Sequence, residues 1–387
     1  MKIAIEAQRI FRPNKHGMDF VAIETIRCLQ RIDTENEYFI FVGEGPDRCL
    51  EETPRMHIVT LRCPSYPLWE QWALPRAVKR VGADLLHCTS NTAPIRTPVP
   101  LIVTLHDIIF LEKQTTRNKS LYQSLGRIYR RIVVPRILPR CRRIVTVSQF
   151  ECNRIRTALG LDPARITAIH NGYNTCFRPM DGTAEVIRSY LPDAAYLFFL
   201  GNTDPKKNTP GTLRAYADYV RRSRRPLPLL VADLTRQAAQ AILREIGEPE
   251  LLRLLRLPGY IPNSDLPAVY NGASAFLYTS LRESFGIPLL EAMACGTPVV
   301  TSAASAIPEV AGEGAILVDP TSPKAIADAL LRLETDADFR AAQIAYGLER
   351  VKLFSWEHTA RQLLALYENV GLSTIQNSTA HDRNHQK

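Results

Sequence analysis

Two kinds of segment alternate along most of the 387-residue chain. Short runs rich in Val, Ile, Leu and Phe predict buried strands, and the longer segments between them carry apolar residues at helical spacing. This alternation is typical of parallel sheets joined by crossover helices, so we expect an α/β fold. The strands predicted in the first half are Lys2–Glu6, Tyr38–Val42, His57–Leu61, Leu85–Cys88, Leu101–Leu105, Ile144–Val147 and Ile166–Ile169.

A polar segment from Arg178 to Asp193 interrupts this rhythm, which resumes at Tyr196. We therefore expect two doubly wound, Rossmann-like domains, residues 1–180 and 181–355, with a site in the cleft where their strand ends face each other. A polar tail over residues 371–387 is predicted to be disordered. The second half is predicted to contain strands at Leu197–Leu200, Leu229–Ala232, Ala275–Tyr278, Pro298–Ser302 and Ala315–Val318, and late helices at Pro323–Leu333, Ala337–Lys352 and Trp356 to about Val370.

Composition narrows the class of protein. The chain is 45% hydrophobic and 22% charged, which excludes disordered and fibrous proteins. No apolar run approaches the roughly 18 residues that span a bilayer, and the first ten residues do not resemble a signal peptide. The eight cysteines form no C-x-x-C pair, and the histidines follow no zinc-binding spacing. We expect a cytoplasmic protein with reduced thiols and no metal.

The net charge of +9 is local, because Lys113 to Arg143 contains ten Lys/Arg and no acidic residue. This segment predicts an amphipathic basic helix that ends near Pro135 and Pro139. Its arginines form either a solvated face of a core helix or a surface for anionic lipid or a phosphate-bearing acceptor. Nucleic acid is disfavoured, because aromatic residues are not interleaved with the basic run. The helix has one side with Leu121, Leu125, Ile128 and Ile132 and another with Arg127, Arg130 and Arg131.

The segment from Thr279 to Thr301 is the most informative for chemistry. It is predicted to contain a strand end, a loop, a helix beginning near Pro288 and a stop at Gly296. Glu283 then lies in the loop and Glu291 one turn into the helix. The amides of the first turn have no partner within the helix, which makes its start suitable for a phosphate. The spacing alone leaves another interpretation open, in which Glu283 is an ordinary acid of a surface loop and Glu291 only complements the helix dipole.

The run E-S-F-G-I-P-L-L-E-A-M-A-C-G-T-P-V-V, from Glu283, resembles the signature of retaining glycosyltransferases of family four, which have the two-domain GT-B fold. The resemblance implies that Glu283 approaches the transferred sugar and that Glu291 holds the nucleotide ribose. Phe285, Gly286 and Ile287 would belong to the same donor-binding loop.

A second resemblance lies in Phe199–Asn208, which is similar to the donor-diphosphate loop of this family. It implies that Gly201 forms the turn and that Lys207 binds phosphate. The family has Arg directly after this glycine, whereas this chain has Asn202. Lys206 is the candidate for the missing cation.

Further segments match, so that the resemblance covers roughly residues 1 to 370. Val103–Asp107 resembles the His-Asp element that places His106 beside the donor sugar. Gly17 resembles the glycine at which the first domain approaches the diphosphate, although Asp19 stands where the family has a second glycine. Tyr260 and Ile261 match the segment that faces the base. In the family, the last helix, here 356–370, completes the first domain.

The resemblance implies transfer of a hexose, with mannose or glucose favoured, from a donor such as GDP-mannose or UDP-glucose to a glycan or lipid-linked acceptor of cell-surface polysaccharide synthesis. Lys207 and the helix-end amides would balance the diphosphate charge without metal or cofactor, Glu283 would stabilise positive charge, and His106 would position the sugar. Arg127, Arg130 and Arg131 would hold the acceptor or the inner membrane surface.

Two rival functions stay open. A nucleotide-sugar epimerase or hydrolase of the same fold would form product without an acceptor. A non-catalytic membrane-surface protein would use the basic helix to recruit partners, and Glu283 and Lys207 would then be dispensable.

Overall fold

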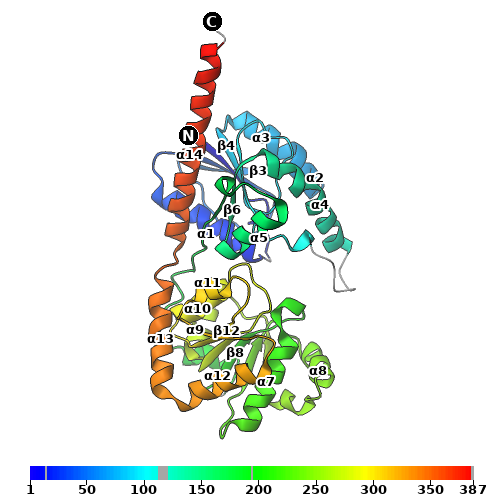
Figure 1. The fold of residues 1–387 in the computed structure, drawn as a ribbon, viewed down its shortest axis with the longest axis vertical. Helices are drawn as coiled ribbons and strands as arrows, with labels where there is room; N and C mark the ends of the chain where they lie inside the picture. The colour runs from blue at the N-terminus through cyan, green and yellow to red at the C-terminus, as the bar shows by residue number, and fades with distance from the viewer. Residues whose placement is uncertain (14, 112–120, 193–194, 385–387) are drawn as a thin grey trace. The chain divides into compact units, whose positions relative to one another are not determined.

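The computed structural model describes residues 1–13, 15–111, 121–192 and 195–384 (Figure 1). The chain divides into two compact units. Unit 1 contains Met1–Asn171 together with Trp356–Lys387, and unit 2 contains Gly172–Ser355. The sequence analysis places this division near residue 180. Each unit has its own buried apolar core.

Unit 1 is built on a seven-stranded parallel sheet in the order β3-β2-β1-β4-β5-β6-β7. The chain moves outward from β1 in one direction and then crosses back to β4, so the order reverses between these two neighbours. The strands are β1 (Lys2–Glu6), β2 (Glu37–Val42), β3 (Met56–Thr60), β4 (Leu85–Cys88), β5 (Leu101–Thr104), β6 (Cys141–Thr146) and β7 (Ile166–Ala168).

Helices cover this sheet, and the last of them, α14 (Trp356–Asn384), packs against the first, α1 (Gly17–Ile32), from the opposite end of the chain (Figure 1). The C-terminal segment is thus an integral part of unit 1. The other helical elements are α2 (Tyr66–Leu68), η1 (Trp69–Ala73), α3 (Leu74–Val81), η2 (Ile109–Leu111), α4 (Leu121–Ile137), η3 (Leu138–Arg140), α5 (Gln149–Leu159) and η4 (Pro163–Arg165).

Unit 2 repeats the design with a six-stranded parallel sheet in the order β10-β9-β8-β11-β12-β13. Its strands are β8 (Leu197–Leu200), β9 (Leu229–Ala232), β10 (Leu255–Gly259), β11 (Ala275–Tyr278), β12 (Val299–Ser302) and β13 (Ile316–Val318). Its helical elements are α6 (Ala184–Arg188), η5 (Pro205–Lys207), α7 (Thr209–Arg222), α8 (Arg236–Glu245), η6 (Pro249–Leu254), α9 (Leu266–Gly272), α10 (Ile287–Ala294), α11 (Ile307–Ala311), α12 (Pro323–Thr335) and α13 (Ala337–Val351).

The predicted α/β class and the twelve predicted strands are confirmed, with strand ends displaced by no more than three residues. The sequence analysis does not predict β10. Pro258 lies in that strand and cannot donate to a sheet ladder, but β10 is at the sheet edge, where one side needs no donor.

One predicted helix end is confirmed and another differs from the structure. Helix α4 ends at Ile137, between Pro135 and Pro139 as predicted, and Pro135 is tolerated in the last turn because it removes only one hydrogen bond of the helix. Helix α14 continues to Asn384, whereas the sequence analysis predicts disorder from residue 371; no proline interrupts this stretch.

The basic helix also has an unexpected orientation. Its apolar residues Leu125, Ile128 and Ile132 are exposed, and Arg127 and Arg131 donate to the carbonyl oxygen of Phe110. Arg130 lies on α4 and is half-buried. The side chain of Leu121 lies outside the described residues. No helix in the described ranges has both the length and the apolar character needed to cross a bilayer.

Candidate active site

The strand order of unit 2 reverses between β8 and β11, and ligands of open α/β sheets bind outside the carboxyl ends of strands at such a point. The loop after β8 carries Lys207, and the loop after β11 carries Glu283. These two sequence-predicted residues are 76 positions apart, yet the topology brings their loops to one place.

Lys207 and Glu283 form a close ion pair. The Lys207 Nζ donates to Glu283 Oε1 at 2.7 Å, and both side chains are largely shielded from solvent. The same ammonium group lies 5.3 Å from the centre of the Tyr278 ring, within the range of a cation–π interaction. Burial and the nearby Glu283 charge raise the pKa of Tyr278 well above its ordinary value, so its phenol stays neutral.

A network of hydrogen bonds fixes the two loops to each other. The backbone amide of Leu281 donates to the carbonyl oxygen of Lys206 at 2.7 Å. Asn208, in the left-handed conformation with φ of 57°, donates from Nδ2 to the carbonyl oxygens of Thr279 at 3.1 Å and Pro320 at 2.7 Å. The segment that carries Lys207 is thus fixed by two segments distant in sequence, Thr279–Leu281 and Pro320.

The turn after β8 requires its glycine. A Cβ at Gly201 would lie 2.7 Å from the Phe199 ring and 2.9 Å from a Val231 methyl group. Asn202, at the position where the resemblance would place Arg, accepts the backbone amide of Asp204 through Oδ1 at 2.9 Å and so shapes the turn. Lys206 is more exposed and lies 3.7 Å from an Asp204 carboxylate oxygen.

Ser305 positions Glu283, a role that the sequence analysis does not identify. The Glu283 amide donates to Ser305 Oγ at 2.9 Å, and the Ala306 amide donates to the Glu283 carbonyl oxygen at 3.4 Å. Ser305 has a φ of 55°, which is uncommon for a residue with a side chain. A serine in a tight turn after β12, where the backbone conformation favours glycine, is the feature that could have identified this residue from the sequence.

The predicted helix after this loop is α10, with Gly286 at its N-cap. Gly286 has a φ of 109°, and a Cβ there would lie 2.9 Å from an Ile307 methyl group, so the turn requires glycine. Within the first turn, Pro288 has no N–H and the Leu289 amide donates to the Gly286 carbonyl oxygen at 3.1 Å, whereas the Ile287 amide has no acceptor within the helix. Phe285 is buried and packs edge-on against Phe354, at 5.9 Å between ring centres.

Glu291 lies one turn into α10, as predicted. Tyr270 Oη donates to its Oε2 in a long hydrogen bond of 3.4 Å. Burial raises the pKa of Glu291 to about 7, and the Tyr270 bond lowers it only in part. Glu291 therefore changes charge close to neutral pH.

The loop after β10 carries Tyr260, which is exposed, and Ile261, which is buried. The loop after β9 joins it, because the Asp233 amide donates to the Gly259 carbonyl oxygen at 2.8 Å. Asp233 has a φ of 60°; desolvation raises its pKa, and the charge of Lys207 opposes this shift. Asp233 is not predicted from the sequence, although its position directly after a buried strand is a usable sign of a site residue.

In unit 1, Gly17 begins α1, and a Cβ there would contact nothing within 4 Å. Asp19 has a clear role in this first turn. Its Oδ2 accepts the His16 amide at 2.9 Å and an Arg12 guanidinium nitrogen at 2.9 Å. Its carboxylate therefore caps the helix and balances a nearby cation.

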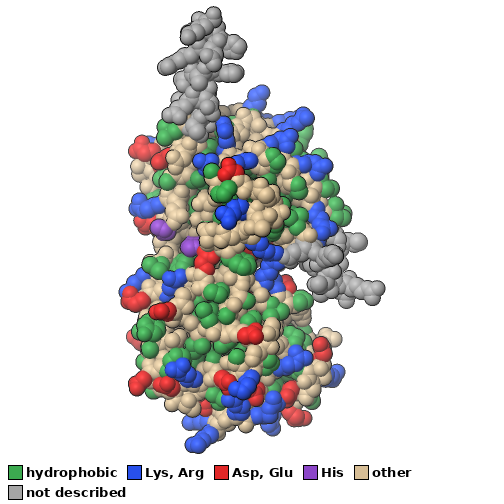
Figure 2. All heavy atoms as spheres, in the orientation of Figure 1, with side chains coloured by type: hydrophobic (Ala, Val, Ile, Leu, Met, Phe, Trp, Pro, Cys, Tyr) green, Lys and Arg blue, Asp and Glu red, His purple; other side chains and the backbone are tan. Residues whose placement is uncertain are grey.

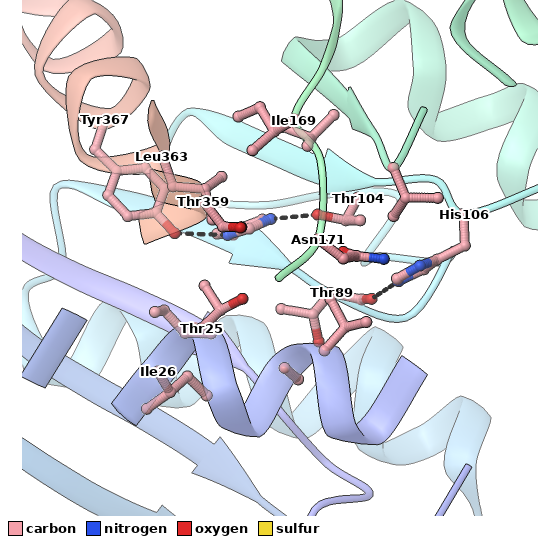
Figure 3. Close-up of a pocket in the computed structure, with 16 residues that line it drawn as sticks. Thr25, Ile26, Thr89, Thr104, His106, Ile169, Asn171, Thr359, Leu363 and Tyr367 are labelled. Atoms are coloured by element: carbon pink, nitrogen blue, oxygen red, sulfur yellow. Dashed lines mark hydrogen bonds between the residues drawn. The ribbon is translucent and has the colours of Figure 1, made fainter. Parts of the chain in front are cut away.

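His106 lies in unit 1 at the end of β5, beside a cavity of about 30 Å³ (Figure 3). Its Nε2 donates to the Thr89 carbonyl oxygen at 2.9 Å, and its backbone amide donates to Asn91 Oδ1 at 2.6 Å. Burial lowers the pKa of His106, which keeps the ring neutral. The cavity is far too small for a sugar ring.

No group of three or more His, Cys, Asp or Glu in the described ranges is placed to hold a metal ion. The sequence contains one Asp-x-Asp triplet, Asp336-Ala337-Asp338. Asp336 caps α13 by accepting the Phe339 amide at 2.9 Å, so this triplet is explained by the helix start.

Two family descriptions match the chain in succession. "Glycosyltransferase Family 4" matches residues 16–177, and "Glycosyl transferases group 1" matches residues 187–350. The second match contains the Lys207–Glu283 pair, Ser305 and Glu291.

Curated relatives include the O-antigen chain mannosyltransferase B of Escherichia coli, 31% identical over 228 residues, which cover 58% of this chain and 60% of the relative. A D-inositol 3-phosphate glycosyltransferase of Nocardioides sp. is 30% identical over 291 residues, which cover 70% of this chain and 62% of the relative. The chain thus spans about three fifths of the length of these curated relatives.

Solved structures share the fold over nearly the whole chain. Sucrose-phosphate synthase from Thermosynechococcus elongatus superposes with a TM-score of 0.73 at 21% identity, covering 96% of this chain and 99% of that one. Anabaena HepE, in complex with UDP and glucose, superposes with a TM-score of 0.69 at 16% identity, covering 95% and 99%.

Proposed function

This chain belongs to the group 1 and family 4 glycosyltransferases and has the GT-B fold, and from that premise we propose that it transfers a hexose from a nucleoside diphosphate sugar with retention of anomeric configuration. The acceptor is a glycan or a lipid-linked glycan of cell-surface polysaccharide synthesis. The observation that carries this proposal is the Lys207–Glu283 pair at the point where the strand order of unit 2 reverses.

Each member of the pair has a role in the reaction. Lys207 and the amides of Gly286 and Ile287 at the start of α10 attract the diphosphate, whose negative charge grows as the bond to the sugar breaks. Glu283 places a carboxylate beside that cation, where it stabilises positive charge at the anomeric carbon and orients sugar hydroxyls. The neutral Tyr278 ring below Lys207 lets the cation stay partly desolvated.

The proposed transfer balances in atoms and charge with the donor sugar and the acceptor alone. The bond between the anomeric carbon and the diphosphate oxygen breaks, and a bond to the acceptor oxygen forms on the same face of the sugar. The acceptor proton passes to the departing diphosphate. In this proposal His106 helps to position the sugar, with its neutral ring held in one tautomer by Thr89.

Glu291 accepts hydrogen bonds from the ribose hydroxyls, since a carboxylate offers paired acceptors to paired donors. The loop after β10, with Tyr260 and Ile261, is assigned to the base. Tyr260 is exposed and available for such a contact.

Mannose and glucose remain the favoured sugars. The mannosyltransferase name of the Escherichia coli relative supports mannose, and the UDP and glucose bound to HepE support a glucose donor. We propose no metal and no cofactor, and we place the protein in the cytoplasm, peripheral to the inner face of the membrane that carries the lipid-linked acceptor.

The test is a binding and turnover panel with GDP, UDP and ADP and their mannose, glucose and N-acetylglucosamine conjugates. Calorimetry identifies the nucleotide, and proton NMR of the product reads the anomeric configuration. Lys207→Met should weaken donor turnover on the order of 10²-fold. The comparison variant, Lys206→Met, removes the second candidate cation, which is more exposed and lies near an Asp204 carboxylate, and should weaken donor turnover much less than Lys207→Met.

Other outcomes point to the rival functions. Product formed at full rate without acceptor would identify a hydrolase or an epimerase. No binding by the panel, together with unchanged biological output of Lys207→Met and Glu283→Gln, would favour the non-catalytic protein.

A further inference from the structure

Helix α4 presents an apolar face to solvent. Leu125, Ile128 and Ile132 are 65%, 53% and 47% exposed, and their spacing puts them on one side of the helix. Scattered apolar residues on a surface need no explanation, but three on one helix face are unusual. Arg127 and Arg131 both donate to the carbonyl oxygen of Phe110, at 3.2 and 2.8 Å, and so hold α4 to η2, although Arg131 is still exposed.

The orientation of α4 is fixed from below by a buried acid. Glu70, in η1, is inaccessible to solvent and accepts hydrogen bonds from Tyr66 Oη at 2.7 Å and Thr92 Oγ1 at 2.5 Å. Tyr129 of α4 donates its hydroxyl to the same carboxyl group. With Val133 buried one turn further on, α4 cannot roll its apolar face inward without breaking this network.

The elements beside α4 add to the exposed apolar surface. Trp72, in η1, is 54% exposed and Leu68, at the end of α2, is exposed too. Gln71 ties this segment to α4 by donating from Nε2 to Tyr129 Oη at 2.8 Å. The Arg76 guanidinium lies over the Trp72 ring at 4.1 Å. Hydrophobic and basic side chains lie among each other in this part of unit 1 (Figure 2).

The two segments that carry the exposed apolar residues present accessible charges of one sign. Residues 125–143 contain seven arginines and no acidic residue. The one acid of the α2–α3 segment, residues 66–81, is Glu70, whose carboxyl group is buried. An aliphatic stripe bordered by cations matches the boundary between anionic headgroups and acyl chains. Nucleic acid would offer the charge but no apolar layer for Leu125, Ile128 and Ile132.

We propose that Leu125, Ile128 and Ile132, with Leu68 and Trp72 beside them, insert into the headgroup region of an anionic bilayer, and that Arg136 and Arg140 contact its lipid phosphates. This lipid-binding face goes beyond the proposed transfer reaction and does not depend on it. Arg127 and Arg131 hold α4 to Phe110 of η2. Arg136 and Arg140 are exposed and donate one nitrogen each to a carbonyl oxygen one turn back in their own segment, at 2.6 Å, so we assign the lipid contact to them rather than to the arginines named from the sequence.

The first experiment is co-sedimentation of the full chain with vesicles of phosphatidylglycerol and phosphatidylcholine, compared with vesicles of phosphatidylcholine alone. The double variant Ile128→Gln/Ile132→Gln should lower partitioning into the anionic vesicles at least about tenfold, because both apolar side chains lose their insertion. The matched control is Tyr346→Gln/Leu353→Gln, which removes two exposed apolar residues of unit 2 and should partition like the unmodified chain. Arg136→Gln/Arg140→Gln should weaken binding at low salt and reduce its salt dependence.

A second measurement follows insertion directly. Trp69 and Trp356 are buried, so Trp72 is the one exposed tryptophan of the three in the chain. Anionic vesicles should shift the fluorescence emission to shorter wavelength, and Trp72→Phe should abolish the shift. Equal partitioning of all variants, or no shift, would overturn the proposal. So would a dimer that Ile128→Gln/Ile132→Gln dissociates, because the face would then bind a second copy.

Neither result depends on the sugar reaction. A chain that binds vesicles as described but lacks transferase activity would retain the lipid-binding face and lose the proposed function. A chain that has transferase activity but does not bind vesicles would retain the proposed function and lose the lipid-binding face.

Discussion

Glu291 shows how one buried residue can couple donor binding to pH. Its pKa is raised to about 7 because burial disfavours the carboxylate. In the proposed complex, the charged form is the one that accepts the ribose hydroxyls.

We therefore expect the donor KM to fall as pH rises through about 7, and to rise by up to about tenfold for each unit below it. Initial rates at varied donor concentration, measured at several pH values, check this. Glu291→Gln cannot titrate and should show a high KM without the pH dependence. The same slope in both proteins would remove Glu291 from this role.

Ser305 combines a strained backbone with a useful hydroxyl. The left-handed conformation costs about 1 kcal/mol for a residue with a Cβ, and the hydrogen bond to the Glu283 amide offsets a similar amount.

Ser305→Ala keeps the strain and loses the bond, so it should lower the free energy of unfolding by about 1 kcal/mol, whereas Ser305→Gly loses both and should stay near the unmodified value. Both variants should lower kcat with little change in donor KM, since only the Glu283 loop loses its support. Urea unfolding and steady-state rates measure the two effects. An unaltered kcat in both would show that Ser305 does not position Glu283.

At the scale of elements, α14 is held to unit 1 by a contact between chain ends. Tyr367 Oη lies 2.7 Å from Nδ1 of His87 in β4, whose Nε2 lies 2.8 Å from Thr104 Oγ1 in β5 (Figure 3). Burial lowers the pKa of His87 to about 3, so the ring is neutral. Each of its two ring nitrogens then makes one hydrogen bond, Nδ1 with Tyr367 and Nε2 with Thr104.

Tyr367→Phe should destabilise unit 1 by about 1–3 kcal/mol, because a buried ring nitrogen loses its partner. Circular dichroism during urea unfolding, which follows both units, measures this change. Tyr346→Phe, on the exposed surface of α13, is the control and should have no effect. Equal stability of both variants would show that the His87 contact does not hold α14.

The two helix ends predicted from local sequence had different outcomes. Helix α4 ends at Ile137, near Pro135 and Pro139 as predicted, because the proline ring limits a helix at its own position. The disorder predicted from residue 371 rests on the polar composition of the tail, and α14 instead continues as a helix to Asn384. Proline is thus a reliable local signal for a helix end, whereas polar composition is not.

At the scale of the whole molecule, the two units have separate cores, with Leu105 in one and Leu277 in the other, both fully buried. All three tryptophans belong to unit 1. Fluorescence therefore reports the unfolding of unit 1 alone, whereas circular dichroism reports both units.

We expect the units to unfold as separate cooperative bodies. Leu105→Ala should lower the free energy of unfolding of unit 1 by about 2–5 kcal/mol and so move the fluorescence midpoint to lower urea. Leu277→Ala should leave the fluorescence midpoint unchanged and move to lower urea only the part of the circular dichroism transition that comes from unit 2. If Leu277→Ala moved the fluorescence midpoint equally, the two units would unfold as one.

The sequence by itself determined the α/β class, twelve strands and the family, because apolar runs and the motif around Glu283 and Glu291 are written in neighbouring residues. Whereas the return of the last helix to unit 1 was already implied by the family resemblance, only the tertiary structure decided that Lys207 pairs with Glu283 and that Ser305 supports it. It also decided that the apolar side of α4 faces outward, because the buried Glu70 holds Tyr129 on the opposite side. Such contacts join residues far apart in the chain, and their geometry follows from how the elements pack rather than from the order of their amino acids.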